Sequence, residues 1–489
     1  MGNSLGRRRK SLVILLRLSG IIWRGGVAIS LFALAGCVVG PNYRPPSDSQ
    51  LNLPSAYPVA TPTTAVAAQA ARWWEDFDDP TLTKLIDLAL ADNLSLAQAA
   101  ERIAQAEEAR NQARGEFFPK FSTDTTDGRN FSNKFPDSDS FSGNARVSWL
   151  IDLFGGLARN KEASTRFLEA AGFDYADLRT TIAAQIAESY INYRSDKIRL
   201  GIALQALAYQ RENEDIAKWR AMAGLVSDLD VQQARIQSER TAGTIPAIEL
   251  SLEQSRNRMS VLTGRAPGAM AQWLADDTPI PVAKSSIDAG VPADVLRQRP
   301  DVRASERRLA GATALIGVAK AQLLPQLTLT GNIGTSAQDV SSLGDVITAG
   351  LFGSLSQSLF EGGNLRSRVR ERRAAARESL ASYRSSILNA LQEVSDSIAA
   401  RNAMQSRLES VARADTAADA AVDIARAQYR TGLTSFQSLL TAEQSWLSAK
   451  DDSAFARSSL SLSQVRLFLA IGGGWDASAI DAAPEGKRN

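Results

Sequence analysis

The chain contains two copies of one sequence unit, and this duplication constrains its fold more than any other feature. Pro119 in the first copy aligns with Pro325 in the second, an offset of 206. The Phe-Gly-Gly sequence at 154–156 returns as Phe-Glu-Gly-Gly at 360–363. A repeat found before any secondary structure is assigned predicts that both copies form the same set of elements.

Each copy includes one very long segment that favours helix. Residues 157–222 contain no Pro and only two Gly, and residues 364–431 contain neither. Apolar residues recur three or four positions apart, as at Ile182, Ile186 and Tyr190. A helix of ~66 residues is ~100 Å long at 1.5 Å per residue, which exceeds a globular domain.

Shorter helices are predicted to run back beside each long one. One return comprises 228–263 and 300–323, and the other comprises 436–470 and 94–117. The Pro- and Gly-containing stretch 264–299 interrupts the first return and is predicted to form a belt around the middle of the helices.

Four short segments are predicted to be strands, near 119–130, 143–153, 326–337 and 349–360. Apolar Leu327, Leu329 and Ile333 alternate with polar residues, which is the pattern of a strand with two different faces. Seven of the 16 Phe lie between Phe117 and Phe154. Transmembrane strands alternate in this way and carry aromatic girdles, although a soluble hairpin core would also give this pattern.

The N-terminus predicts export. A basic run, Arg7 to Lys10, precedes an apolar stretch that ends at Leu34-Ala35-Gly36-Cys37. This is typical of a secretion signal over 1–36. The last four residues resemble the lipobox of bacterial lipoproteins, which implies cleavage before Cys37 and lipidation of its thiol; the alternative is a buried Cys after an ordinary signal. Val38 then favours the outer membrane by the same resemblance. Residues 37–76 are predicted to be a lipidated tether.

Composition excludes several functions. The chain has no His and one Cys, so no Ser-His dyad, imidazole-bound zinc or thiolate cluster can form, and we expect neither an enzyme nor a cofactor or metal. A carboxylate-based hydrolase has no supporting pair of acids. Removing six basic residues with 1–36 leaves 49 basic (55 − 6) against 53 acidic residues, a net charge of −4. We therefore expect no nucleic-acid partner.

The predicted strands require several copies of the chain. No apolar run after Cys37 approaches the ~20 residues of a membrane-spanning helix, so a crossing would use strands. Four strands cannot close a barrel, and an open edge in lipid leaves backbone groups unsatisfied. Three copies would supply twelve strands. The predicted fold class is an α+β membrane protein: a trimeric 12-stranded β-barrel continued by a long α-helical periplasmic barrel, with an internal two-fold repeat.

Three motifs resemble the TolC-like outer-membrane factors, specifically the lipoprotein branch that serves resistance-nodulation-division (RND) efflux pumps. They are Cys37-Val38-Val39-Gly40-Pro41-Asn42-Tyr43, Arg299-Pro300-Asp301-Val302-Arg303 with Glu306, and the sequence at 224–234. The resemblance covers nearly all of the mature chain. It implies a homotrimer in the outer membrane that docks to a periplasmic adaptor and an inner-membrane pump.

The resemblance also places a gate at the periplasmic tips, at the turns near 224 and 432. The gate candidates are Asp228, Asp230, Tyr429, Arg430 and Glu443. The candidates for adaptor contact are Gly224, Leu225, Val226, Ser227, Gly432, Leu433, Thr434 and Ser435. Thr441 stands where the family often has Asp. Alternatively, each candidate is a solvated tip residue or, at Ser227 or Asp228, a helix cap.

These predictions divide the chain into the signal, the tether, a first repeat over 77–282, a second repeat over 283–470 and a tail over 471–489. The predicted function is a passive outer-membrane exit duct for drugs or other small molecules. Two alternatives stay open: a TolC-like exit for type I protein secretion, and a pore-less periplasmic coiled-coil lipoprotein.

Overall fold

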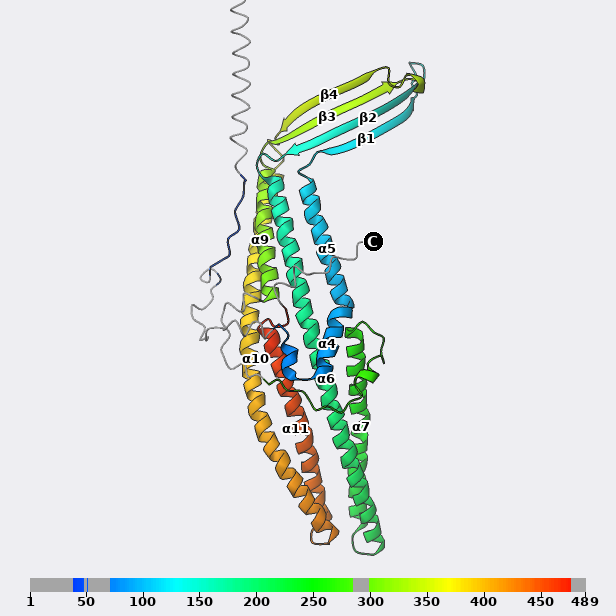
Figure 1. The fold of residues 1–489 in the computed structure, drawn as a ribbon, viewed down its shortest axis with the longest axis vertical. Helices are drawn as coiled ribbons and strands as arrows, with labels where there is room; N and C mark the ends of the chain where they lie inside the picture. The colour runs from blue at the N-terminus through cyan, green and yellow to red at the C-terminus, as the bar shows by residue number, and fades with distance from the viewer. Residues whose placement is uncertain (1–37, 48–50, 52–70, 285–298, 476–489) are drawn as a thin grey trace, which may run out of the picture. The chain divides into compact units, whose positions relative to one another are not determined.

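The computed structural model describes residues 38–47, 51, 71–284 and 299–475 (Figure 1). The predicted signal over 1–36, Cys37, most of the tether and the end of the tail lie outside the described residues. The helices are α4 (Pro80–Asp92), α5 (Leu94–Gly115), α6 (Gly156–Met222), α7 (Asp228–Leu262), α9 (Pro300–Ala321), α10 (Asn364–Arg430) and α11 (Phe436–Ala470). The short 3-10 helices are η1 (Trp73–Phe77), η2 (Ala271–Trp273) and η3 (Val340–Ser342).

The chain forms two compact units. The first comprises the described residues up to 47 together with 103–170 and 305–383, and the second comprises the rest. Each unit therefore draws segments from both sequence copies, because the long helices α6 and α10 each begin in the first unit and end in the second.

The first unit contains a four-stranded antiparallel sheet in the order β1-β2-β3-β4. Its strands are β1 (Lys120–Asn130), β2 (Ser138–Ile151), β3 (Gln326–Ala337) and β4 (Ile347–Ser356). The register pairs Phe121 with Val147, and Trp149 with Leu329. Strands β2 and β3 come from different copies, so the sheet joins the two halves of the duplication, and the predicted number of strands per chain is confirmed.

The sheet differs most from the sequence prediction at the start of β2 and the end of β4. β2 begins at Ser138. Its residues 138–142 pair with β1, although they hold a single apolar residue, Phe141, and so lack an apolar alternation that the sequence could reveal. β4 ends at Ser356, and residues 357–363 form the irregular turn that leads into α10. Gly362 and Gly363 both have positive φ in this turn, which side chains other than glycine rarely adopt.

The second unit is built around its long helices. Trp73 of η1 stacks on Phe468 of α11 with ring centroids 5.6 Å apart. Asp79 caps α4 by accepting hydrogen bonds from two backbone amides, and the Tyr190 hydroxyl of α6 donates to the same carboxylate at 2.8 Å. These buried contacts fix α4 against α6.

The described part of the predicted belt, 264–284, packs against helices of the second unit. The Tyr193 hydroxyl donates to the Leu274 carbonyl at 3.2 Å, and the Arg194 guanidinium donates to the Asp276 carbonyl. The backbone amide of Ala283 donates to the Gln464 side chain of α11 at 3.0 Å. The segment is thus bonded to both α6 and α11.

No helix in the described ranges is both long and apolar enough to cross a membrane.

Candidate functional site at the two hairpin tips

The second unit contains two helical hairpins, α6 with α7 and α10 with α11, whose turns have the same geometry. Gly224 and Gly432 have φ of 72° and 77°. In the first turn the Leu225 amide donates to the Arg220 carbonyl at 2.8 Å, and in the second the Leu433 amide donates to the Gln428 carbonyl at 2.8 Å. A left-handed glycine with this 6→1 bond is the Schellman motif, which ends a helix sharply.

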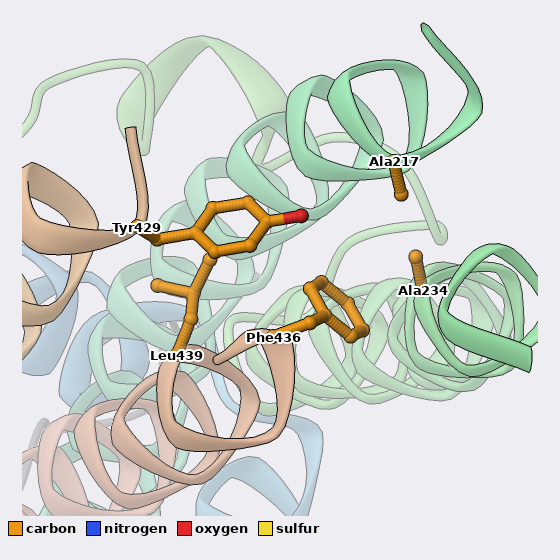
Figure 2. Packing of buried hydrophobic residues seen from close by; sticks show 5 residues of the cluster. All are labelled: Ala217, Ala234, Tyr429, Phe436 and Leu439. Atoms are coloured by element: carbon orange, nitrogen blue, oxygen red, sulfur yellow. The ribbon is translucent and has the colours of Figure 1, made fainter. Parts of the chain in front are cut away.

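The predicted gate residue Tyr429 is not a free lumen side chain in the single chain. It is 2% exposed and belongs to an apolar cluster that joins both hairpins (Figure 2). Its ring lies 5.7 Å from the ring of Phe436, centroid to centroid. The other members are Ala217 and Ala234 of the first hairpin and Leu439 of the second. Within the described residues the Tyr429 hydroxyl has no hydrogen-bond partner.

Arg220 links the end of α6 to the end of α10. Its guanidinium carbon lies 4.5 Å from the centroid of the Tyr429 ring, and the same group donates to the Tyr429 carbonyl at 2.8 Å and the Arg430 carbonyl at 3.2 Å. The last carbonyls of a helix lack partners within it, so an arginine there both completes hydrogen bonds and matches the negative end of the helix dipole.

Glu443, the predicted acid that follows the second turn, is buried between helices. Its carboxylate accepts from Asn213 of α6 at 2.8 Å and from Arg426 of α10 at 3.2 Å. Burial raises the pKa of this carboxyl above its usual value, and Arg426 opposes the shift. The Arg426 guanidinium also lies 3.8 Å from the centroid of the Tyr209 ring. Glu443 therefore bonds α11 to its neighbours on both sides.

The remaining gate candidates lie at the surface. Asp228 is exposed and Asp230 half-buried in the first turn of α7, where negative charge is favoured by the helix dipole. Arg430 forms an exposed ion pair with Glu212 at 2.9 Å. Ser435 caps α11 through the Ser438 amide, whereas Ser227 makes no side-chain cap bond.

Apolar side chains are exposed around both turns. Leu225 and Leu433, which occupy equivalent positions in the two copies, are 73% and 78% exposed. Trp219 and Met222 of α6 are also exposed. Such a group on a tip marks a surface suited to contact with another protein.

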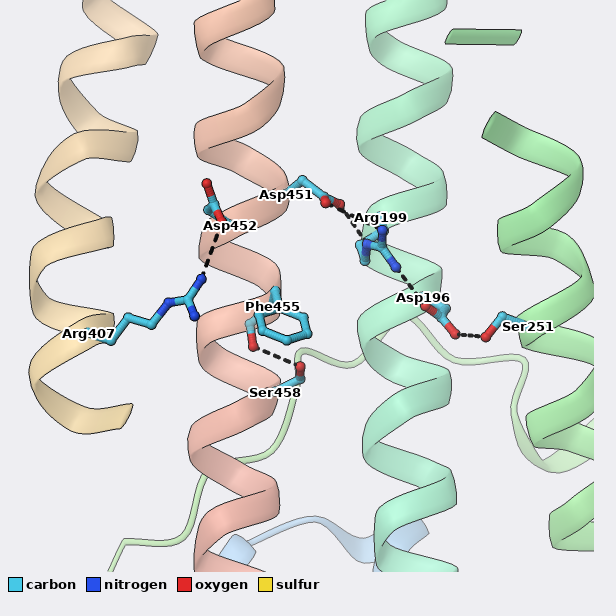
Figure 3. Close-up of polar contacts among 8 residues, drawn as sticks. All are labelled: Asp196, Arg199, Ser251, Arg407, Asp451, Asp452, Phe455 and Ser458. Carbon is cyan, nitrogen blue, oxygen red and sulfur yellow. Dashed lines mark hydrogen bonds and ion pairs between the residues drawn. The ribbon is translucent and has the colours of Figure 1, made fainter. Parts of the chain in front are cut away.

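A layer of polar contacts also connects α6, α7, α10 and α11 away from the tips (Figure 3). Arg199 of α6 pairs with Asp451 of α11 at 2.6 Å and with Asp196 at 3.3 Å, and Ser251 of α7 donates to Asp196 at 2.5 Å. Arg407 of α10 reaches Asp452 of α11 at 3.4 Å. The layer therefore ties α11 to both long helices.

Sequence reasoning missed the partners of the predicted residues. Asn213, Arg220 and Arg426 were not singled out, because they are ordinary polar residues of long helices with no local motif. The one available signal was that basic residues lie near the C-terminal ends of α6 and α10, where they suit the helix dipole. Among the described residues no group of three or more His, Cys, Asp or Glu could hold a metal ion.

The comparisons with known proteins agree with this arrangement. The sequence model of the outer membrane efflux protein family matches residues 85–265 and 291–473. Nodulation protein T of Rhizobium leguminosarum bv. trifolii is 30% identical over 460 residues, which cover 91% of this chain and 96% of that protein. The toluene efflux pump outer membrane protein TtgF of Pseudomonas putida is 29% identical over 473 residues, or 92% and 96%.

Solved structures give the same result. The outer-membrane channel OprN is 32% identical and superimposes with a TM-score of 0.78, covering 90% of this chain and all of that one. The CmeC outer membrane channel of Campylobacter jejuni, at 23% identity, shares the fold with a TM-score of 0.80 over 91% of this chain and 98% of that one. The predicted fold class and family resemblance are confirmed: the chain belongs to the outer membrane efflux protein family.

Proposed function

We propose that three copies of this chain form a passive outer-membrane duct of a tripartite efflux pump, through which drugs or other small molecules leave the cell. The family and the efflux-pump relatives support the transport role. The observation that supports a trimer is the four-stranded sheet: among the described residues, its outer strands β1 and β4 each have one unpaired edge.

Edge pairing between copies would satisfy these backbone groups. An open sheet edge is not tolerated in lipid, and closure into a barrel removes every edge. β4 of one copy pairs with β1 of the next, and three copies give twelve strands. The exposed apolar residues Leu351, Phe352 and Leu355 on β4 suit a lipid boundary or a neighbouring copy.

The described residues next to Cys37 support a lipid anchor. The Val39 amide donates to the Phe154 carbonyl at 3.0 Å, where β2 leads into α6. An acyl chain on Cys37 would thus begin at the membrane-proximal end of the helices. Metabolic labelling with palmitate should be lost in Cys37→Ser; retained labelling would exclude Cys37 as the acylated residue.

The partners are a periplasmic adaptor, which contacts the turns at 224–227 and 432–435, and an inner-membrane RND-type pump. The exposed Leu225 and Leu433 support a protein contact at these turns. Residues Asp230, Tyr429 and Glu443 hold the closed tip, because the last two bond the hairpins of one chain together.

Planar bilayer recording and electron microscopy of the detergent-extracted protein test the proposal. We expect single-channel conductance and a threefold particle with a barrel at one end. A particle without threefold symmetry, or one that never conducts even after the tip is loosened by mutation, would contradict it.

A further inference from the structure

A cluster of arginines occupies the first four turns of α10, within the first unit. Six lie between Asn364 and Glu378: Arg366, Arg368, Arg370, Arg372, Arg373 and Arg377. The same stretch holds two acids, Glu371 and Glu378, so its net charge is +4 (6 − 2). All six arginines are exposed.

Four of the six lie on one face of the helix. Arg366, Arg370, Arg373 and Arg377 are spaced four, three and four residues apart, which places them in one row. Like charges at these spacings repel one another and destabilise the helix. Arg366 also lies in the first turn, where the helix dipole disfavours positive charge. The row therefore lowers the stability of the isolated helix in both ways.

No acid in the described part of the chain forms an ion pair with these arginines. Arg370 donates to the Ser367 hydroxyl at 2.8 Å, and the structure records no side-chain partner for the other five. The row is therefore a positively charged surface that the single chain leaves without a counter-charge.

The first copy provides an internal comparison. Arg159 and Arg166 occupy the positions equivalent to Arg366 and Arg373, at the start of α6. Arg159 pairs with Glu162 at 2.7 Å and Arg166 pairs with Glu169 at 2.9 Å. Residues 157–171 carry three basic and two acidic side chains, a net charge of +1. The excess charge is thus specific to the second copy and is not required to begin a helix at this junction.

Apolar side chains precede the arginines. Leu359 and Phe360, in the turn between β4 and α10, are 91% and 89% exposed. Exposed aliphatic and aromatic side chains next to arginines are typical of the boundary between lipid tails and head groups.

We propose that this arginine row binds the anionic phosphates of phospholipid head groups in the periplasmic leaflet of the outer membrane. This rests on the proposed function, because the strands must cross the membrane for α10 to begin at its surface. Leu359 and Phe360 enter the apolar edge of that leaflet, and the arginines donate hydrogen bonds to the head-group phosphates beside it. Attraction to an anionic surface strengthens affinity about fivefold per basic residue and is screened by salt.

Native mass spectrometry of the purified full-length oligomer in mixed micelles tests the proposal, with phosphatidylglycerol and phosphatidylcholine as probes. The wild type should retain phosphatidylglycerol at least about tenfold better at low salt, and lose this preference at high salt. The triple variant Arg370→Gln, Arg373→Gln, Arg377→Gln should lose the preference at low salt, and the corresponding Lys variant should keep it.

The control removes the same charge elsewhere. Arg211, Arg240 and Arg258 are exposed on α6 and α7 of the second unit. Their triple Gln variant should bind phosphatidylglycerol like the wild type. Inorganic phosphate at matched concentration should not displace the lipid, which separates a membrane surface from a free-phosphate site.

Three results would overturn the inference: no lipid preference in the wild type, an unchanged preference in the arginine variant, or displacement by phosphate. Bilayer recording distinguishes lipid binding from a role inside the pore. A shifted reversal potential in the arginine variant, with normal lipid retention, would place the arginines in the pore and overturn the inference. Conductance of the wild type is measured in the same experiment. A conducting channel without lipid preference refutes this inference alone, and a protein that does not conduct even after the tip is loosened by mutation refutes the proposed function.

Discussion

Among the described carboxyl groups of the second unit, that of Asp177 has the most strongly raised pKa. Burial, and next the nearby Asp301 carboxylate, raise its pKa to about 6. A carboxyl whose pKa is raised on folding contributes stability at low pH, and that contribution is lost as pH rises through about 6.

We therefore predict that Asp177→Asn stabilises the protein at pH 8 by on the order of 1–2 kcal/mol and leaves it little changed at pH 4. Thermal unfolding of both proteins across this pH range measures the difference. An equal gain or loss at both pH values would show that the carboxyl does not titrate as described.

The gate candidates permit a second prediction at the scale of residues. Removing both charges in Asp230→Asn with Glu443→Gln should raise the resting conductance in planar bilayers. Glu443 accepts from Arg426 and Asn213, and weakening a charged hydrogen bond by about 1.5–3 kcal/mol changes an open–closed equilibrium tenfold or more.

The control for the gate is Glu239→Gln with Glu249→Gln, which removes two exposed acids from α7. Its conductance should match that of the wild type. Unchanged conductance in the Asp230→Asn, Glu443→Gln variant would contradict the proposal that these residues hold the tip closed.

At the scale of residues, the sequence indicates candidate positions but not their contacts. The family resemblance points to Glu443 as an acid near the second turn, but its partner Asn213 lies 230 positions away in the sequence and no local pattern connects the two. Tyr429 was predicted as a gate side chain, and the structure buries it because Phe436 and Leu439 return beside it after the turn.

At the scale of elements, the turn glycines give a prediction with a matched control. Gly432 has positive φ, and a methyl group there would meet no atom within 4 Å, so Gly432→Ala is strained only by its backbone. That strain is about 1–2 kcal/mol. Hydrogen exchange at the Leu433 amide should become about fivefold faster or more, because its bond to Gln428 depends on the turn.

Gly243 lies within α7 and is equally open, but its φ is not positive. Gly243→Ala should therefore slow exchange in the surrounding α7 amides, since alanine favours helix by about 0.5–1 kcal/mol. We therefore expect Gly432→Ala to speed local hydrogen exchange and Gly243→Ala to slow it. Equal effects would mean that φ does not determine the stability of the tip.

Helices and turns could be predicted from the sequence more completely than side-chain contacts. The long helices could be predicted because Pro and Gly are rare over some 66 residues, and their turns because Gly224 and Gly432 interrupt that pattern. The start of β2 could not be predicted, because its mostly polar residues give no apolar alternation. The duplication supplied the rest, since each strand and turn was visible twice.

At the scale of the whole molecule, the number of copies can be counted directly. Co-expression of tagged and untagged chains should give four species on a native gel, carrying zero, one, two or three tags. This follows from the closure of twelve strands by three copies. Three species would indicate a dimer and five a tetramer, and either would contradict the twelve-stranded barrel. Separately purified forms mixed after extraction serve as the control.

The two hairpin turns have the same backbone bonds but different side chains around them. In a threefold assembly they would alternate around the rim as six hairpins of two kinds, so the rim would repeat every 120° and not every 60°. A docking ring with six identical contacts would then meet two chemically distinct kinds of hairpin tip in alternation. Such a ring would have to bind both kinds of tip or only every second tip. Mutations confined to one copy of the repeat would reveal which.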